Sequence, residues 1–178
     1  MDDLSSLNLK FDPRNPLSIS SSNFSTNQNE VLLKVNQDLW IGTSYGLNKY
    51  NLSSNLNKRF YETKDSKTLN SNYINDLFFV DKKFSSGKIA IANKILAATQ
   101  NGLAIINPEN NEISNYNSLK NTNIYNTFSI DDDIIIHSEE GLFIIDKIDE
   151  EEIFLRKISN TNGFGKTRKI TDNEFILY

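Results

Sequence analysis

The chain has 178 residues, the length of one ordinary domain, and 38% of them are hydrophobic. This fraction supports a packed core and excludes wholesale disorder. A mild net charge of −4 without a basic face argues against a nucleic-acid-binding protein, and the absence of cysteine excludes disulfides and thiolate metal sites.

The N-terminal stretch MDDLSSLNLKFDPRNP is acidic and polar, so it is not a signal peptide. No apolar run approaches the roughly 18 residues that a membrane-spanning helix needs. If the natural protein is exported, we expect its leader to lie outside this chain. We likewise expect any contact with a membrane to be made through regions outside it.

The first predicted elements are four short strands, at residues 30–35, 38–43, 46–51 and 57–62. They contain the stretch LWIGTSYGLNKYN, which starts at Leu39 and runs through Gly46-Leu47. Apolar runs rich in β-branched and aromatic residues favour strands, and glycine suits the positive φ of a short hairpin turn. Because these runs are continuously apolar rather than alternating, we expect both faces of the sheet to be covered.

The same pattern recurs in the next part of the chain. ILAATQNGLAIIN starts at Ile95, contains Gly102-Leu103, and belongs to predicted strands at 73–80, 94–99, 102–107 and 112–116. The tight turn between the first two of these strands is replaced by an insertion, DKKFSSGKIAIANK, at residues 81–94. We expect this insertion at the end of the sheet opposite the Gly-Leu turn, where it is available to an interface with a partner.

A third copy, IIIHSEEGLFIID, starts at Ile134 and contains Gly141-Leu142. It belongs to predicted strands at 124–130, 133–138, 141–146 and 152–158, and FILY at the C-terminus resembles the start of a fourth copy. Polar segments lead into the second and third units, namely TLNSNYI (68–74) and SLKNTNIY (118–125). PLSISSSNF (16–24) is a degenerate counterpart that precedes the first unit.

A repeated four-stranded antiparallel unit of about 40 residues, apolar on both faces, is typical of a β-propeller blade. A β-sandwich and a β-solenoid are the alternatives, but sandwiches rarely repeat their sequence and solenoid coils are shorter. The predicted fold is therefore all-β, a partial β-propeller of about three four-stranded antiparallel blades with flanking strands. The expected boundaries are 1–29 for an N-terminal segment or the end of a preceding blade, then blades at 30–72, 73–117 and 118–160, and the start of another at 161–178.

These stretches also resemble the two-component regulator propeller repeat. That pattern has a Leu-Trp-Ile-Gly-Thr strand, a Gly-Leu return with an aromatic residue soon after, and a Ser-Leu-x-x-Asn-x-Ile linker into the next blade. The first copy is close to it, while the second keeps Thr99 and Gly102 but has Leu96 where tryptophan is usual. The third copy is weaker, with Ile135 at the tryptophan position and His137-Ser138 in place of Gly-Thr.

The resemblance implies a function as well as a fold. Propellers of this family form the extracytoplasmic sensor regions of hybrid histidine kinases that respond to oligosaccharides. It therefore implies a non-enzymatic bacterial domain, in the periplasm or on the cell surface, that senses or binds a ligand such as a glycan. The alternative is a cell-surface or type IX secretion-associated scaffold that binds partner proteins.

Family propellers typically have seven blades, which would need roughly 300 residues. About three blades cannot close a ring, and the blade at each end would expose an apolar face. We therefore expect this chain to be a piece of a longer propeller whose other blades cover those faces, or to be completed by another polypeptide.

Candidate ligand-binding residues follow from the loops that meet at one end of a propeller channel. The turns between second and third strands lie there together with the inter-blade linkers. Tyr45 is the candidate for stacking on a sugar or peptide, and Asn101 and Glu140 are the candidate hydrogen-bond partners. The alternative is that all three are ordinary solvated turn residues.

Other motifs predict structure rather than chemistry. NTNGFGKT (160–167) has Asn160 where a phosphate loop needs glycine, and a strand rather than a helix follows. The acidic runs at 131–133 and 149–152 lack the alternating spacing of a calcium loop. His137 is the single histidine, which argues against a zinc site or a catalytic triad, and Trp40 is assigned to the blade core.

Enzymatic activity is not predicted. Apart from Glu139-Glu140, the repeat places no paired carboxylates at the channel mouth for acid–base catalysis. We expect no catalytic residue, metal or cofactor. The expected partners are a small-molecule or glycan ligand or a partner protein, and not nucleic acid.

Overall fold

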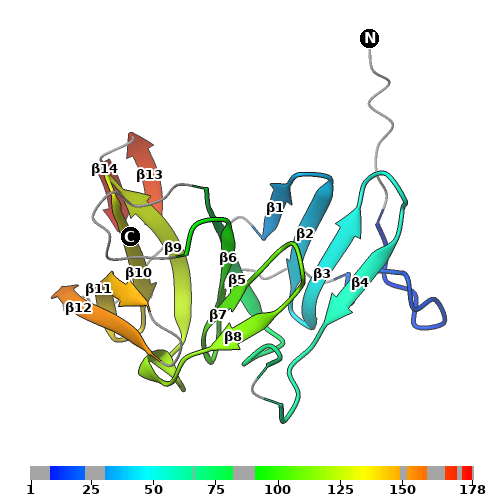
Figure 1. Ribbon diagram of the computed structural model, residues 1–178, viewed down its shortest axis with the longest axis horizontal. Helices are drawn as coiled ribbons and strands as arrows, with labels where there is room; N and C mark the ends of the chain where they lie inside the picture. The colour runs from blue at the N-terminus through cyan, green and yellow to red at the C-terminus, as the bar shows by residue number, and fades with distance from the viewer. Residues whose placement is uncertain are drawn as a thin grey trace.

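The computed structural model describes residues 9–22, 31–65, 67–81, 91–148, 152–159, 167–171 and 174–177. The described residues form β-strands, turns and one short 3-10 helix, Asn117–Leu119. Figure 1 shows three twisted sheets side by side along the long axis of the molecule. The predicted all-β fold with four-stranded antiparallel units is confirmed, and these sheets do not close into a ring.

Each sheet consists of four consecutive strands in chain order, all antiparallel. Blade 1 contains β1 (Leu32–Val35), β2 (Asp38–Thr43), β3 (Gly46–Asn51) and β4 (Asn57–Phe60). Blade 2 contains β5 (Ile74–Val80), β6 (Lys94–Thr99), β7 (Gly102–Ile106) and β8 (Ile113–Asn115). Blade 3 contains β9 (Ile124–Ile130), β10 (Asp133–Ser138), β11 (Gly141–Ile148) and β12 (Ile153–Ser159).

The predicted strands differ from these by at most two residues at either end. β4 ends at Phe60 rather than at 62, and β11 continues to Ile148, two residues beyond the expected end, through a β-bulge between Ile145 and Lys147. A last hairpin, β13 (Thr167–Thr171) and β14 (Glu174–Leu177), pairs antiparallel at the position of the expected fourth copy. The NTNGFGKT loop and most of the insertion lie outside the described residues.

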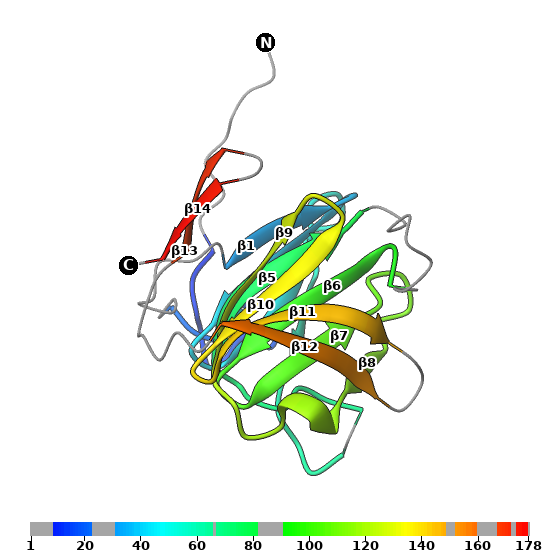
Figure 2. The same ribbon diagram turned by 90° about the vertical axis from the view of Figure 1, so that its left-hand side faces the viewer.

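The blades are arranged as in a propeller, with their first strands together. β1 contacts β5, and β5 contacts β9 (Figure 2). Two polar residues of β5 bond the edge of β9 that faces away from β10. The Asn75 amide donates to the carbonyl of Ile124 at 2.6 Å, and Asp76 accepts the Thr127 N–H at 2.9 Å. Side chains of one blade thus satisfy backbone groups of the next, which holds the unpaired inner strands in place.

Each blade face is buried against its neighbour. Because side chains alternate along a strand, Ile95 and Ala97 of β6 face blade 1, whereas Leu96 and Ala98 face blade 3. All four are fully buried. Trp40, which is also fully buried, stacks on Phe60 with ring centroids 5.7 Å apart, in the core between blades 1 and 2. Its assignment to the blade core is therefore confirmed.

The N-terminal segment 9–22 covers the other face of blade 1. Ile19 packs on Ile41 and Tyr50, and the Asn48 side chain accepts the Ser20 N–H at 2.8 Å. Arg59 of β4 donates to the carbonyl of Ser18 at 2.6 Å. The expectation of a bare apolar face at this end is therefore wrong, because polar side chains of blade 1 hold this segment over its apolar ones.

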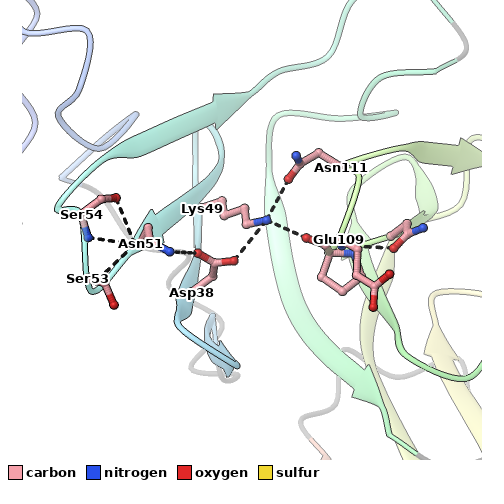
Figure 3. Close-up of polar contacts among 9 residues, drawn as sticks. Asp38, Lys49, Asn51, Ser53, Ser54, Glu109 and Asn111 are labelled. Carbon is pink, nitrogen blue, oxygen red and sulfur yellow. Dashed lines mark hydrogen bonds and ion pairs between the residues drawn. The ribbon is translucent and has the colours of Figure 1, made fainter.

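Lys49 joins blades 1 and 2 at the end opposite the Gly-Leu turns (Figure 3). Its ammonium lies 3.1 Å from a carboxylate oxygen of Asp38, and it donates to the carbonyl of Pro108 at 2.6 Å and to Asn111 Oδ1 at 3.1 Å. Asp38 also accepts from the Asn51 amide at 2.7 Å. One lysine of blade 1 is thus bonded to the β7–β8 turn of blade 2.

Candidate functional site at the linker end

A hydroxyl residue organises each turn between the second and third strands. Thr43, Thr99 and Ser138 donate to the carbonyl of the glycine three residues later, at 2.9, 2.8 and 3.2 Å respectively. Each also accepts the N–H of the residue two positions on, at 3.1 to 3.2 Å. Gly46, Gly102 and Gly141 have φ of 117°, 109° and 124°, as the hairpin prediction requires. From the sequence, the position three residues before each glycine was recognised only as small or polar. The signal that could have revealed its role is the hydroxyl residue that occurs there in all three copies.

The turns and the inter-blade linkers lie at the same end of the blades, which we call the linker end. The N–H of Gly46 donates to the carbonyl of Asn72 at 2.6 Å, and the N–H of Glu139 donates to the carbonyl of Asn123 at 3.0 Å. Asn72 lies in the linker just before β5, the first strand of blade 2, and Asn123 lies just before β9, the first strand of blade 3. The predicted meeting of turns and linkers is therefore confirmed.

Tyr45, the first candidate ligand-binding residue, is exposed at the tip of the blade 1 turn. Its side chain is 61% exposed, which is the largest value among the exposed apolar side chains of the described residues. The ring meets that of Tyr61 edge-on, with centroids 6.2 Å apart. This position leaves most of the Tyr45 ring available to a ligand.

Asn101, the second candidate, occupies the equivalent position of blade 2 but is engaged within the protein. Its amide donates to the carbonyl of Asn70 at 3.0 Å, and its carbonyl oxygen accepts the N–H of Asn121 at 3.0 Å. Asn70 belongs to the linker before blade 2 and Asn121 to the linker after it. The side chain therefore connects two linkers.

Glu140, the third candidate, accepts the hydroxyl of Thr122 at 2.8 Å. The neighbouring Glu139 accepts the N–H of Asn123 at 2.8 Å. Burial, together with the charge of Glu139, raises the pKa of Tyr125 above its usual value. Both carboxylates thus bind the linker that leads into blade 3, and the three candidates lie on three successive blades with different partners.

A polar groove of about 280 Å³ opens beside Asn101. One wall is the linker before blade 2, the other includes the end of β8, and Asn115 holds the two together by donating to the carbonyl of Thr68 at 2.5 Å. The groove is lined by Glu62, Thr63, Lys64, Asp65, Leu69, Asn70, Asn101, Asn115, Tyr116 and Lys120. Apart from Asn101, sequence reasoning pointed to this region only as an inter-blade linker.

The groove combines two carboxylates, two ammonium groups, three amides and one tyrosine. Such a lining offers hydrogen-bond donors and acceptors in close proximity, beside an apolar surface of nearly equal extent. In the described part of the chain, no three histidine or acidic side chains are grouped to hold a metal ion. Nor is any helix there both long and apolar enough to cross a membrane.

His137 lies inside β10, as its sequence context predicts, and is buried. It packs edge-on against Tyr125 with ring centroids 5.1 Å apart. Burial lowers the pKa of His137 below its usual value. It occupies the position of Gly42 and Ala98 in the other blades, on the face of blade 3 that points away from blade 2.

Solved extracellular domains of bacterial signalling proteins share this architecture. One, assigned to a hybrid two-component system of B. thetaiotaomicron, aligns with 94% of this chain at 17% identity and a TM-score of 0.67. A second domain of the same kind and organism aligns with 72% of this chain at 21% identity and a TM-score of 0.53. The chain has the fold of these extracellular domains.

The chain covers 23% of the first of these structures and 17% of the second, so it corresponds to a small part of each. No family model matches the sequence, and no curated protein matches it. The structural neighbours belong to the class of signalling system that the repeat pattern resembles. The interpretation of the repeat and the comparison of folds therefore agree.

Proposed function

We propose that this chain is part of an extracytoplasmic ligand-sensing propeller of a bacterial two-component system. The observation that carries the proposal is the polar groove at the linker end, in a chain whose fold matches extracellular domains of such systems. Ligand sites in proteins are concave and contain a few fixed polar groups. The location is outside the cytoplasm, in the periplasm or on the cell surface.

The ligand that this groove suits best is a glycan. Sugar hydroxyls both donate and accept hydrogen bonds, and the groove offers amide, carboxylate and ammonium groups to such partners. Asn70 and Asn115 are held in place by bonds to Thr99 and to the linker, so little side-chain freedom is lost on binding. The volume of about 280 Å³ is near the lower end for ligand pockets, which suits a small saccharide.

Tyr45 and Glu140 extend this proposal along the linker end. The exposed Tyr45 ring offers an apolar face on which a second sugar of a longer ligand can stack. Glu140 retains acceptor capacity beyond its bond to Thr122, because a carboxylate accepts several hydrogen bonds. Asn101, in contrast, serves the groove mainly by positioning its walls.

A longer propeller completes the domain in this proposal. Phe154 and Ile158 of β12 are 42% and 45% exposed. Ile135 and His137 of the same blade are already buried, and they mark its outer face because they correspond to Trp40 and Gly42, which face blade 2 in blade 1. We infer that a further blade covers this face, as blades 2 and 3 cover the corresponding faces before them.

A scaffold function is the second candidate, and one feature favours it. A shallow hollow of about 510 Å³ lies at the opposite end of blade 1. Its lining includes Leu17 and Leu56, which are 49% and 55% exposed. Exposed apolar side chains beside a hollow are typical of protein-binding surfaces. A protein partner at this hollow, with no saccharide in the groove, would support the scaffold.

Titration calorimetry of the chain with a panel of soluble neutral and acidic oligosaccharides tests the main proposal. Replacing both groove lysines, Lys64→Ala with Lys120→Ala, is expected to weaken binding at least about tenfold. The matched control, Lys34→Ala, changes an exposed lysine of β1 outside the groove and should bind normally. Absence of binding to every oligosaccharide, or binding that ignores the groove variants, would refute the glycan proposal.

A further inference from the structure

The side chain of Asn101 joins the two linkers that flank blade 2. Its amide nitrogen donates to the carbonyl of Asn70, 31 residues earlier, and its oxygen accepts the N–H of Asn121, 20 residues later. We propose that Asn101 is a positioning residue that couples these two linkers, so that a change in one is transmitted to the other. This role differs from ligand contact, the role that its place in the turn suggested.

The packing around the next residue supports the same conclusion. A Cβ atom added to Gly102 would lie 2.7 Å from the carbonyl oxygen of Leu119 and 2.8 Å from the amide nitrogen of Asn70. Both linkers therefore lie directly against this glycine. Asn70 is fixed further, because its oxygen accepts the hydroxyl of Thr99 at 3.1 Å. The blade 2 turn thus packs closely against both linkers at Gly102.

The equivalent residues of the other blades bond differently. Tyr45 contacts the ring of Tyr61, in the linker that leaves its own blade. Glu140 bonds Thr122, in the linker that enters its own blade. Asn101 contacts both an entering and a leaving linker, because its carboxamide supplies both a donor group and an acceptor oxygen. This difference in chemistry assigns the coupling to the central blade of the described residues.

Through this coupling, a ligand bound in the groove can act on the linker that leads into blade 3. Lys64 and Asp65 line the groove from the first linker, and Lys120 lines it from the second. A ligand that draws these walls together therefore acts on both sides of Asn101. This use of the coupling rests on the proposed function, whereas the coupling itself is a property of the protein without ligand.

The first linker can be loosened by changing the side chain of Thr68, which does not line the groove and whose backbone carbonyl still accepts the Asn115 amide. The Thr68 hydroxyl donates to the carbonyl of Asp65 at 2.8 Å and accepts the N–H of Thr63 at 3.1 Å. Thr68→Val removes both bonds and the 3.0 Å contact between the hydroxyls of Thr63 and Thr68, with little change in shape. A double-mutant cycle that combines Thr68→Val with Asn101→Asp then shows whether the change in the first linker alters hydrogen exchange of the Asn121 amide in the second linker.

The measurement is residue-resolved amide hydrogen exchange by NMR on the whole chain. Asn101→Ala is expected to speed exchange of the Asn121 amide about tenfold by removing its acceptor. Asn101→Asp keeps that acceptor but loses the donor to Asn70, so it should retain protection while uncoupling the linkers. Thr68→Val should speed Asn121 exchange several-fold in the wild type and leave it unchanged in the Asn101→Asp background.

Two controls separate coupling from general loosening. Amides of β10 report global opening, so the change in their exchange is subtracted from the change at Asn121 in each variant. Asn110→Asp changes an asparagine of the β7–β8 turn and should leave the effect of Thr68→Val intact. An equal effect of Thr68→Val in both Asn101 backgrounds, or no effect in the wild type, would overturn the inference. Loss of saccharide binding in the groove variants has no bearing on this exchange experiment, so the two proposals fail separately.

Discussion

The ammonium of Lys49 in blade 1 lies 2.6 Å from the carbonyl oxygen of Pro108 in blade 2. This contact spans the seam between two sheets at the end where the linkers do not reach. It is reinforced by Asp38 at 3.1 Å, and the Lys49 side chain is only 15% exposed. The blade 2–3 seam has Ile105 at the corresponding position, within an apolar cluster. At this position the two seams are thus held by different chemistry.

Lys49→Met is expected to lower the free energy of unfolding by about 1–3 kcal/mol. The substitution keeps the aliphatic stem but leaves the Pro108 carbonyl and one oxygen of Asp38 without their cation. Urea unfolding monitored by tryptophan fluorescence measures the change, since Trp40 lies beneath the ammonium at 5.2 Å. Lys34→Met, at an exposed position of β1, is the control and should change stability by less than about 0.5 kcal/mol. Equal effects of the two variants would contradict this account of the seam.

Gly102→Ala is expected to destabilise the protein by about 2–4 kcal/mol. A φ of 109° is unfavourable for any residue with a Cβ, and the new methyl group would meet the carbonyl of Leu119 at 2.7 Å. Thermal unfolding followed by circular dichroism provides the measurement. Asn93→Gly is the matched control at another turn residue with positive φ, where glycine relieves strain and should be neutral or slightly stabilising. A Gly102→Ala variant as stable as the wild type would show that the turn is not held between the linkers.

Thr99→Val tests the hydroxyl that organises the blade 2 turn. It removes the donor to the Gly102 carbonyl, the acceptor of the Asn101 N–H and the bond to Asn70, at nearly constant volume. We expect a loss of about 1–3 kcal/mol, because these groups are then left in a buried site without that partner. Thr99→Ser retains the hydroxyl and should stay within about 1 kcal/mol of the wild type. If chemical denaturation gives Thr99→Ser and Thr99→Val the same free energy of unfolding, the Thr99 hydroxyl does not organise the turn.

We expect the free energy of unfolding to decrease as the pH is lowered, because of His137. Burial lowers the pKa of His137 in the folded protein, whereas the unfolded chain takes up the proton near the usual value of about 6.5. Between the lowered pKa and about pH 6.5 the unfolded state binds more protons, so stability is complete above this window and decreases as the pH falls through it. Urea unfolding from about pH 8 to pH 5 measures the slope. His137→Gln should have a shallower slope than the wild type, and parallel curves would refute the prediction.

The strands could be predicted from sequence because their signals are local. Apolar runs ending before Gly46, Gly102 and Gly141 located the hairpins, and the observed strand ends differ by at most two residues. The order of strands in each sheet followed from the short turns between them. These features depend on residues adjacent in the chain, for which turn geometry and β-propensity are sufficient.

The candidate site was predicted only in part because its contacts are long-range. Asn101 and Glu140 were correctly placed at the linker end, but their bonds to Asn70, Asn121 and Thr122 depend on how linkers cross the turns. No spacing in the sequence reveals that Asn101 lies between two linkers. The packing of segment 9–22 on Ile41 could not be predicted from the sequence either. It depends on hydrogen bonds from polar residues such as Arg59, which look like ordinary surface residues in the sequence.

Gly42 has a consequence for the way such a chain assembles. A Cβ at this position would lie 2.6 Å from the Ile74 side chain of the next blade, so the seam closes only around a residue without one. The corresponding residues are Ala98 in blade 2 and His137 in blade 3, and each is larger than the one before. A blade that carried a methyl group or an imidazole at this position would place it where Ile74 needs room. The absence of a side chain at Gly42 therefore favours blade 1, rather than blade 2 or 3, as the sheet that precedes Ile74.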